Sequence, residues 1–575
     1  MPKIKKLLVA NRSEIAIRVF RAANELGIRT VAVWAEEDKY ALHRFKADES
    51  YQVGRGPHLA KDMGPIESYL SIEEVIRVAK LSGADAIHPG YGLLSESPEF
   101  ADACAEAGIV FIGPRPETMR RLGNKVAARN LAIEIGVPVV PATDPLPDDI
   151  EAVKKLAAQI GYPLMLKASW GGGGRGMRAI REEADLAREV TEARREAKAA
   201  FGKDEVYLEK LVERARHVEV QVLGDTHGNA VHLFERDCSI QRRNQKVVER
   251  APAPYLGDAR REELCGHALK IAEATDYVGA GTVEFLMDAD TGKFYFIEVN
   301  PRIQVEHTVT EEVTGIDIVK AQIRILEGEK IGTPESGVPA QADIRLHGHA
   351  LQCRITTEDP EQNFVPDYGR ITAYRSAAGF GIRLDGGTAY SGAIITRYYD
   401  PLLVKVTASG ATPEEAISRM DRALREFRIR GVATNLTFLE AIIGHPKFRD
   451  NSYTTRFIDT TPELFASVKR QDRATKLLTY LADVTVNGHP ETRGRPKPNA
   501  EAAAPRVPYI DAAIPDGTRQ KLDALGPEKF AEWMRGESRV LFTDTTMRDG
   551  HQSLLATRMR TFDIASIAGV YARAL

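Results

Sequence analysis

The first 115 residues alternate short apolar runs with amphipathic stretches. The apolar runs have the length of strands and lie at 7–9, 30–34, 86–88 and 110–112, and the stretches with helical spacing lie at 14–26, 72–80 and 99–107. Strands that alternate with helices in this way are typical of a parallel sheet covered by helices on both faces. The pattern therefore predicts a doubly wound α/β domain. Because no G-x-G-x-x-G follows the first run, no dinucleotide site is expected in it.

A second pattern lies farther along the chain, where every second residue is polar. The polar positions are Glu298, Asn300, Arg302, Gln304 and Glu306, and the residues between them are apolar. In an extended chain these side chains would share one face. The simplest interpretation is a half-buried strand with a solvated face. Two features favour a site instead: the preceding run 294–297 is almost wholly apolar, and the polar face has no Lys, Ser or Thr.

An acidic strand is also predicted just upstream, at 281–287, and the segment 288–293 would join the two strands as a hairpin. If the hairpin is centred on Thr291, Glu284 lies directly opposite Glu298, whereas a slip of one residue would separate them. Like charges opposite each other destabilise a sheet. A facing Glu pair with Asn300 nearby suits Mg²⁺ or Mn²⁺ bound together with substrate phosphates.

A glycine-rich segment supplies a candidate phosphate site. The apolar run 162–166 ends at Lys167, four consecutive glycines occupy 171–174, and a second strand is predicted at 177–180. Glycine lets backbone N–H groups approach phosphate oxygens closely. The glycines expected to close over the phosphates are Gly172, Gly173, Gly174 and Gly176. No Gly-Lys-Ser/Thr follows and no helix is predicted after the loop, so this is not a Walker A motif.

These features, together with Lys125, resemble the ATP-grasp enzymes and, more narrowly, the biotin carboxylases. The matching segments are 11–18, 88–96, 235–246, 302–307 and 353–360, within a resemblance that covers about 4–458. The resemblance implies a pre-ATP-grasp domain at 1–125, an ATP-grasp domain at 126–345 with a lid at about 140–210, and a small β-rich subdomain at 346–458. Segments 475–488 and 544–553 resemble pyruvate carboxylases, which implies an allosteric or linker region at 459–535 and the start of a carboxyltransferase barrel at 536–575.

The resemblance also implies an activity, the ATP-dependent carboxylation of biotin by bicarbonate through carboxyphosphate. It assigns Glu306 as the base, Arg302 and Arg354 as ligands of the anions, Lys246 as a neighbour of the transferred phosphate, and Glu284, Glu298 and Asn300 as metal ligands. It assigns to ATP the residues Lys125, Lys167, Glu209, Lys210, His217, Gln241 and Asn244, and it completes the bicarbonate pocket with Gln304 and Val305. Many family members have His where this chain has Asn244, and an amide cannot titrate near neutrality.

The C-terminal resemblance is less complete. Asp549 matches the first metal ligand of the transferase barrel, but the later ligands and the biotin-bearing Met-Lys-Met segment are absent from these 575 residues. We therefore expect only the first half of the reaction that converts pyruvate to oxaloacetate, with a biotinyl carrier domain as partner. Arg428, Arg430 and Arg473 resemble positions used for acetyl-CoA, although ordinary surface arginines are an equal alternative. The resemblance implies a homodimer of carboxylase domains and a homotetramer of the full-length enzyme.

Composition and the distribution of residue types bear on the number of domains, the class of partner and the cellular location. The 575 residues suggest three to five domains, and a formal net charge of −3 suggests neither a nucleic-acid nor a membrane partner. No apolar run approaches the roughly 20 residues of a membrane span. A strand that begins near the N-terminus leaves no room for a targeting peptide, and four cysteines without CxxC spacing suit the cytoplasm. The alternatives are another ATP-grasp carboxylase, of the acetyl- or propionyl-CoA carboxylase type, another ATP-grasp ligase, or a non-catalytic acetyl-CoA-binding module.

Several further elements are predicted from local pattern. Helices are expected at 183–200, 413–427 and 527–533, the last with a proline at its first position. Strands are expected at 379–383, 402–406 and 540–544.

Overall fold

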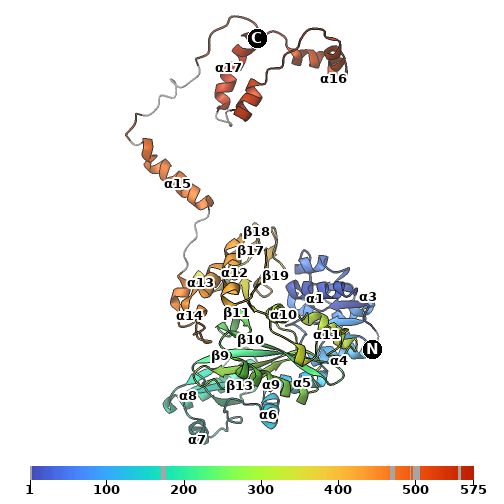
Figure 1. The fold of residues 1–575 in the computed structure, drawn as a ribbon, viewed down its shortest axis with the longest axis vertical. Coiled ribbons are helices and arrows are strands. Elements are labelled where there is room, and N and C mark those ends of the chain that lie inside the picture. The colour runs from blue at the N-terminus through green and yellow to red at the C-terminus, as the bar shows by residue number, and fades with distance from the viewer. Residues whose placement is uncertain are drawn as a thin grey trace. The chain divides into compact units, whose positions relative to one another are not determined.

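The computed structural model describes residues 3–169, 177–466, 473–492, 494–496, 506–554 and 559–574. The chain forms two compact units, Met1–Val468 and Lys469–Leu575 (Figure 1). None of the helices in the described ranges has both the length and the apolar character that a bilayer crossing requires.

The N-terminal part of the first unit is the predicted doubly wound domain. Its five strands pair in parallel in the order β3-β2-β1-β4-β5. They are β1 (Lys6–Val9), β2 (Arg29–Trp34), β3 (Glu49–Gln52), β4 (Ala86–His88) and β5 (Val110–Phe111). The accompanying helices are α1 (Ser13–Glu25), α2 (Pro65–Leu70), α3 (Ile72–Ser82), α4 (Pro98–Glu106), α5 (Pro116–Gly123) and α6 (Lys125–Glu134). Strand β3 was not predicted, because its sequence Glu-Ser-Tyr-Gln has no apolar run.

The predicted lid is a small three-stranded antiparallel sheet. Its strands β6 (Leu164–Ala168), β7 (Arg178–Ile180) and β8 (Val206–Lys210) are accompanied by α7 (Ile150–Ile160) and α8 (Glu183–Phe201). The two strands predicted around the glycine loop and the charged helix after it are confirmed. The loop itself, with Trp170, Gly172, Gly173, Gly174 and Gly176, lies outside the described residues.

An eight-stranded antiparallel sheet connects the ATP-grasp half to the C-terminal third of the first unit (Figure 1). Its order is β13-β12-β9-β10-β11-β14-β21-β19. The strands are β9 (Ala215–Gly224), β10 (Ala230–Arg242), β11 (Gln245–Ala251), β12 (Gly279–Asp288), β13 (Phe294–Asn300), β14 (His349–Thr356), β19 (Ile382–Gly386) and β21 (Leu402–Gly410). Helices α9 (Asp258–Ala274), α10 (His307–Thr314), α11 (Ile318–Leu326) and α12 (Pro413–Glu426) pack against it or beside it.

Shorter elements complete the C-terminal third of this unit. They are β15 (Glu358–Asp359), β16 (Val365–Pro366), β17 (Gly369–Arg370), β18 (Ala373–Arg375), β20 (Ile394–Ile395), β22 (Arg428–Arg430), α13 (Leu436–Gly444) and α14 (Pro446–Arg449). The helix predicted at 413–427 and the strand predicted at 402–406 are confirmed as α12 and β21. The strand predicted at 379–383 lies instead at Ile382–Gly386, because Gly379 and Gly381 have positive φ angles that do not fit a strand.

The acidic hairpin has the predicted register at the site. Glu284 on β12 pairs with Glu298 on β13, and the next pair toward the turn is Phe285 with Phe296. Ile297 therefore has no partner and forms a β-bulge. The alternation expected to continue as strand to Glu306 does not do so: β13 ends at Asn300, since Pro301 has no N–H to continue the ladder.

The second unit contains helices but no strand among its described residues. Its helices are α15 (Arg473–Asn487), α16 (Thr518–Gly536), α17 (Thr561–Ala574) and a π-helical segment, Thr546–Leu554. Helix α16 is interrupted at Gly526, so its second part begins at Pro527 as predicted. The strand predicted at 540–544 is wrong, because that short apolar run has no neighbouring strand to satisfy its N–H and C=O groups.

Candidate active site

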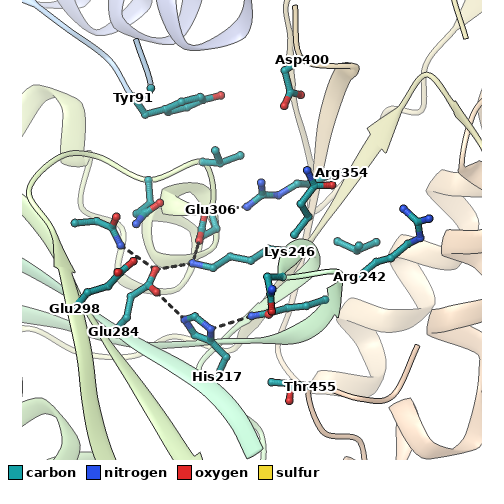
Figure 2. A pocket seen from close by; sticks show the side chains of 18 of the residues that line it. Tyr91, His217, Arg242, Lys246, Glu284, Glu298, Glu306, Arg354, Asp400 and Thr455 are labelled. Atoms are coloured by element: carbon teal, nitrogen blue, oxygen red, sulfur yellow. Dashed lines mark hydrogen bonds and ion pairs between the residues drawn. The ribbon is translucent and has the colours of Figure 1, made fainter. Parts of the chain in front are cut away.

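A cavity of about 1270 Å³ lies in the first unit, and it brings together distant parts of the chain. The N-terminal domain, the lid, the eight-stranded sheet and the loop before α10 all contribute to its wall. Figure 2 shows Tyr91 of the N-terminal domain on one side of the cavity and His217 of the sheet on the other. Every residue predicted to act in catalysis, nucleotide binding or metal binding by the carboxylase, apart from the glycine loop, lines this cavity: Lys125, Lys167, Glu209, Lys210, His217, Gln241, Asn244, Lys246, Glu284, Glu298, Asn300, Arg302, Gln304, Val305, Glu306 and Arg354.

Lys246 is the centre of the charged cluster. It lies on β11, and its Nζ is 2.5 Å from Glu219 Oε2, 3.0 Å from Glu284 Oε1 and 2.6 Å from Glu306 Oε1. Burial alone would lower the pKa of Lys246, but the three carboxylates raise it well above its ordinary value. The ammonium therefore remains charged at every pH of interest and links both sides of the cavity.

Glu306 is fully buried at the position just before α10. Besides Lys246, it accepts a hydrogen bond of 3.0 Å from Nη2 of Arg354. Burial opposes its ionisation, yet Lys246, Arg354 and Arg236 together hold its pKa well below the ordinary value. In the absence of substrate this carboxylate is ionised and can accept a proton only weakly, because two cations occupy its oxygens.

The hairpin pair carries the candidate metal ligands. Glu284 Oε2 lies 3.1 Å from Nε2 of His217, and its Oε1 accepts a hydrogen bond of 2.9 Å from Nδ2 of Asn300. Glu298 Oε2 lies 3.2 Å from Nζ of Lys125. Each carboxylate thus faces a cationic or hydrogen-bond-donating side chain, and two facing carboxylates are the donor type that a divalent cation prefers. Asn300 was expected to offer an oxygen, but here its amide nitrogen faces Glu284.

The predicted nucleotide residues line one side of the cavity. Lys167 on β6 forms an ion pair with Glu209 on β8, so the lysine predicted to bind phosphate and the carboxylate predicted to contact the base or ribose are adjacent. Lys210 donates to the carbonyls of Gly161 and Tyr162 at 2.9 and 2.8 Å. Gln241 Nε2 lies 2.9 Å from Nδ1 of His217. Asn244 occupies a positive-φ turn between β10 and β11 (φ 64°).

The two predicted anion-binding arginines are each held by an acidic partner. Nε of Arg302 donates to Glu96 at 2.6 Å and its Nη1 donates to Gln304 at 2.9 Å. Nε of Arg354 donates to Glu249 at 2.6 Å. These bonds fix the planes of both guanidinium groups at the cavity wall, which is the arrangement that planar anions require.

The sequence interpretation missed several residues that hold this cluster together. Glu219 is completely buried between Lys246 and Arg236, whose Nε donates to it at 2.6 Å. Glu249 is completely buried beneath Arg354. A signal for Glu219 existed: in β9, His217 and Glu219 are two residues apart, so they share a face of the strand.

Comparison with known proteins shows which family has this fold and this set of cavity residues. The sequence matches the biotin carboxylase N-terminal domain at 3–119, the carbamoyl-phosphate synthase L chain ATP-binding domain at 124–333 and the biotin carboxylase C-terminal domain at 352–460. The biotin carboxylase domain of Hydrogenobacter thermophilus 2-oxoglutarate carboxylase is 45% identical and superimposes with a TM-score of 0.75, over 81% of this chain and 99% of that one. The chain belongs to the biotin carboxylase family.

Longer relatives match beyond the carboxylase part. Pyruvate carboxylase from Staphylococcus aureus is 54% identical over 99% of this chain but only 49% of its own length. A structure of Rhizobium etli pyruvate carboxylase with acetyl coenzyme A is 82% identical with a TM-score of 0.78, over 99% of this chain and 50% of that one. The chain thus spans about half the length of the curated relatives it matches. The resemblance to both families, and with it the fold, is confirmed.

Arg428 and Arg430 are not among the residues that line this cavity, and Arg473 and Asp549 belong to the second unit. Arg428 and Arg430 are exposed on β22. Arg473 is the first residue of α15, and Asp549 lies in the π-helical segment of the second unit, where it pairs with Arg548. In the described part of the chain, no group of three acidic, His or Cys ligands forms around Asp549.

Proposed function

We propose that this chain catalyses the ATP-dependent carboxylation of biotin by bicarbonate. One observation carries the proposal: a buried carboxylate, Glu306, lies between Lys246 and Arg354 in a cavity that also contains the facing pair Glu284 and Glu298. A base held between two cations suits a small anion that must be deprotonated and then phosphorylated. In support, the Hydrogenobacter domain was solved with MgADP and bicarbonate.

ATP is proposed to bind along the lid side of the cavity. Lys125 and Lys167 would pair with its phosphates, while Glu209 and His217 would contact the base or ribose. Lys210, Gln241 and Asn244 would complete this nucleotide site, and Gly172, Gly173, Gly174 and Gly176 would cover the phosphates. Glu284, Glu298 and Asn300 would hold Mg²⁺ or Mn²⁺, which spreads charge over the phosphates when bound.

Bicarbonate would occupy the side formed by Arg302, Gln304 and the Val305 backbone. The ATP phosphates offer Lys246 a new anionic partner, so its hold on Glu306 weakens when ATP is bound. Glu306 then takes the hydroxyl proton of bicarbonate, whose oxygen attacks the terminal phosphorus and displaces ADP. The resulting carboxyphosphate breaks into CO₂ and phosphate. Phosphate removes the ureido N–H proton of biotin, Arg354 stabilises the ureido oxyanion, and the nitrogen attacks CO₂ to give carboxybiotin.

The wider setting is proposed from the longer relatives. The carboxylation would be the first half of the pyruvate carboxylase reaction, with a biotinyl carrier domain as the partner that delivers biotin, in a cytoplasmic homo-oligomer. Arg428, Arg430 and Arg473 would contribute to an acetyl-CoA site, and Asp549 would be the first metal ligand of a transferase barrel. We propose the domain limits 1–125, 126–345, 346–458, 459–535 and 536–575 for this arrangement.

Phosphate release measured with ATP, free biotin and bicarbonate tests the proposal. Release should depend on both biotin and bicarbonate, and it should be slow because untethered biotin lacks the effective concentration that a carrier provides. ATP cleavage that ignores bicarbonate would indicate another ATP-grasp ligase. Absence of nucleotide binding would indicate a non-catalytic module.

A further inference from the structure

A buried ion pair outside the Lys246 cluster connects two distant segments of the first unit. Nζ of Lys405, on β21, lies 3.1 Å from Oε2 of Glu14, in the first turn of α1. The side chain of Lys405 is 0% exposed and that of Glu14 is 3% exposed. A buried ammonium is costly unless it is paired and hydrogen-bonded. An apolar side chain would fill this core position at lower cost, so the charge requires an explanation.

Lys405 also holds the backbone of the candidate site. Its Nζ donates a hydrogen bond of 2.9 Å to the carbonyl of Val305, the residue immediately before Glu306. Because the peptide group is planar and trans, fixing this carbonyl also fixes the direction of the Glu306 N–H. The same hydrogen bond restricts the position of the Glu306 Cα, from which the side chain extends. The ammonium therefore acts on the segment that carries both the base and the bicarbonate-facing backbone.

Glu14 extends the same connection to another part of the cavity wall. Its Oε1 accepts a hydrogen bond from the hydroxyl of Tyr91, which lines the cavity on the side away from His217 (Figure 2). Burial raises the pKa of Glu14, and Lys405 opposes that shift. Asp385 on β19 is a further carboxylate in the field of Lys405. The pair thus links Tyr91, α1, β21 and the segment before α10.

We propose that Lys405 and Glu14 are positioning residues that set the orientation of the Val305–Glu306 peptide for activation of bicarbonate. The catalytic part of this inference rests on the proposed function. Neither residue touches the reacting atoms; each acts through the backbone or through its partner. An enzyme without the pair keeps every side chain of the cluster but presents the base and the adjacent N–H in the wrong direction.

The test replaces both members of the pair, Lys405→Met with Glu14→Gln, so that no unpaired charge is left in the core. A matched control, Arg261→Met with Glu235→Gln, removes a partly buried ion pair of 3.0 Å whose residues do not line the cavity. We expect the kcat of bicarbonate-dependent ATP cleavage to fall by about 10²-fold in the test variant, as for other small misplacements of a catalytic group. The KM for ATP should stay within about twofold, and the control should keep the parent kcat.

Hydrogen exchange of the peptide 301–309 gives a second readout that requires no turnover. The amides of this segment should exchange faster in the test variant than in the parent or the control. Parent-like kcat or parent-like exchange in the test variant would overturn the proposal, as would an equal loss of kcat in the control. If the parent itself shows no bicarbonate-dependent cleavage, the proposed function fails, while the exchange measurement still decides whether the pair orients this peptide.

Discussion

Replacing Lys246 by Met removes a cation that Glu219, Glu284 and Glu306 share. Removing one partner of a buried ion pair costs roughly 3–5 kcal/mol, because it leaves charge without compensation. Here three carboxylates lose the same partner. Met is similar to Lys in volume, so the cost arises from the missing charge rather than from an empty space. We expect the free energy of unfolding to fall by about 3–5 kcal/mol at pH 8.

This loss should depend on pH in a defined direction. Lys246 lowers the pKa of Glu284 and of Glu306, so its removal raises both. The folded variant then binds more protons than the folded parent at pH values between the parent's lowered pKa values and the raised ones. The stability of the variant relative to the parent therefore falls as pH rises through that window, by up to about 1.4 kcal/mol per unit for each extra proton. The difference between parent and variant should shrink from pH 8 to pH 5.

Urea unfolding of parent and variant at pH 5 and pH 8 measures both effects. Lys125→Met provides the comparison, because the Lys125 side chain is 45% exposed beside Glu298 and such pairs contribute roughly 0–1 kcal/mol. A difference between parent and Lys246→Met that is the same at both pH values would refute the electrostatic explanation. So would a loss no larger than that of the Lys125 variant.

Four further substitutions test the proposed roles. Glu306→Gln should lower biotin-dependent ATP cleavage by about 10²- to 10⁴-fold with nucleotide affinity unchanged; turnover at the parent rate would exclude Glu306 as the base. Glu284→Ala and Glu298→Ala should each weaken MgATP more than metal-free nucleotide; an unchanged Mg²⁺ titration in both would make the pair structural. Arg354→Lys cannot bridge Glu249 and Glu306 as the guanidinium does, so kcat/KM for bicarbonate should fall about tenfold while KM for ATP is constant.

The N-terminal domain was predictable from the sequence because its strands are buried on both faces. Such strands are nearly continuous apolar runs, and the helices between them have clear spacing. Strand β3 lacks this signal because it lies at the edge of the sheet, where Glu49–Gln52 are only half-buried. At 540–544 a strand was predicted but none forms, because an apolar run becomes a strand only where a neighbouring strand can satisfy its backbone N–H and C=O groups.

The candidate site residues that could be predicted from the sequence are those that lie in short motifs rich in charged and amide side chains. Lys246, Arg354 and the two hairpin carboxylates were identified that way, and the cavity brings them together. Glu219, Glu249 and the pair Glu14–Lys405 were missed, because their function depends on contacts between segments far apart in the chain. A buried charge is recognisable in a sequence only when its partner is known.

The bulge at Ile297 lets the length of the hairpin turn vary without changing the pairing of Glu284 with Glu298. Strand β12 pairs with β9 without interruption from Gly279 to Asp288, so Glu284 is fixed by the centre of the sheet. The irregularity is confined to β13, the edge strand. A change of one residue in the exposed turn can therefore be absorbed by moving or removing the bulge, while Glu298 stays opposite Glu284. Among relatives, we expect insertions and deletions to be tolerated in this turn but not at the proposed metal ligands Glu284 and Glu298.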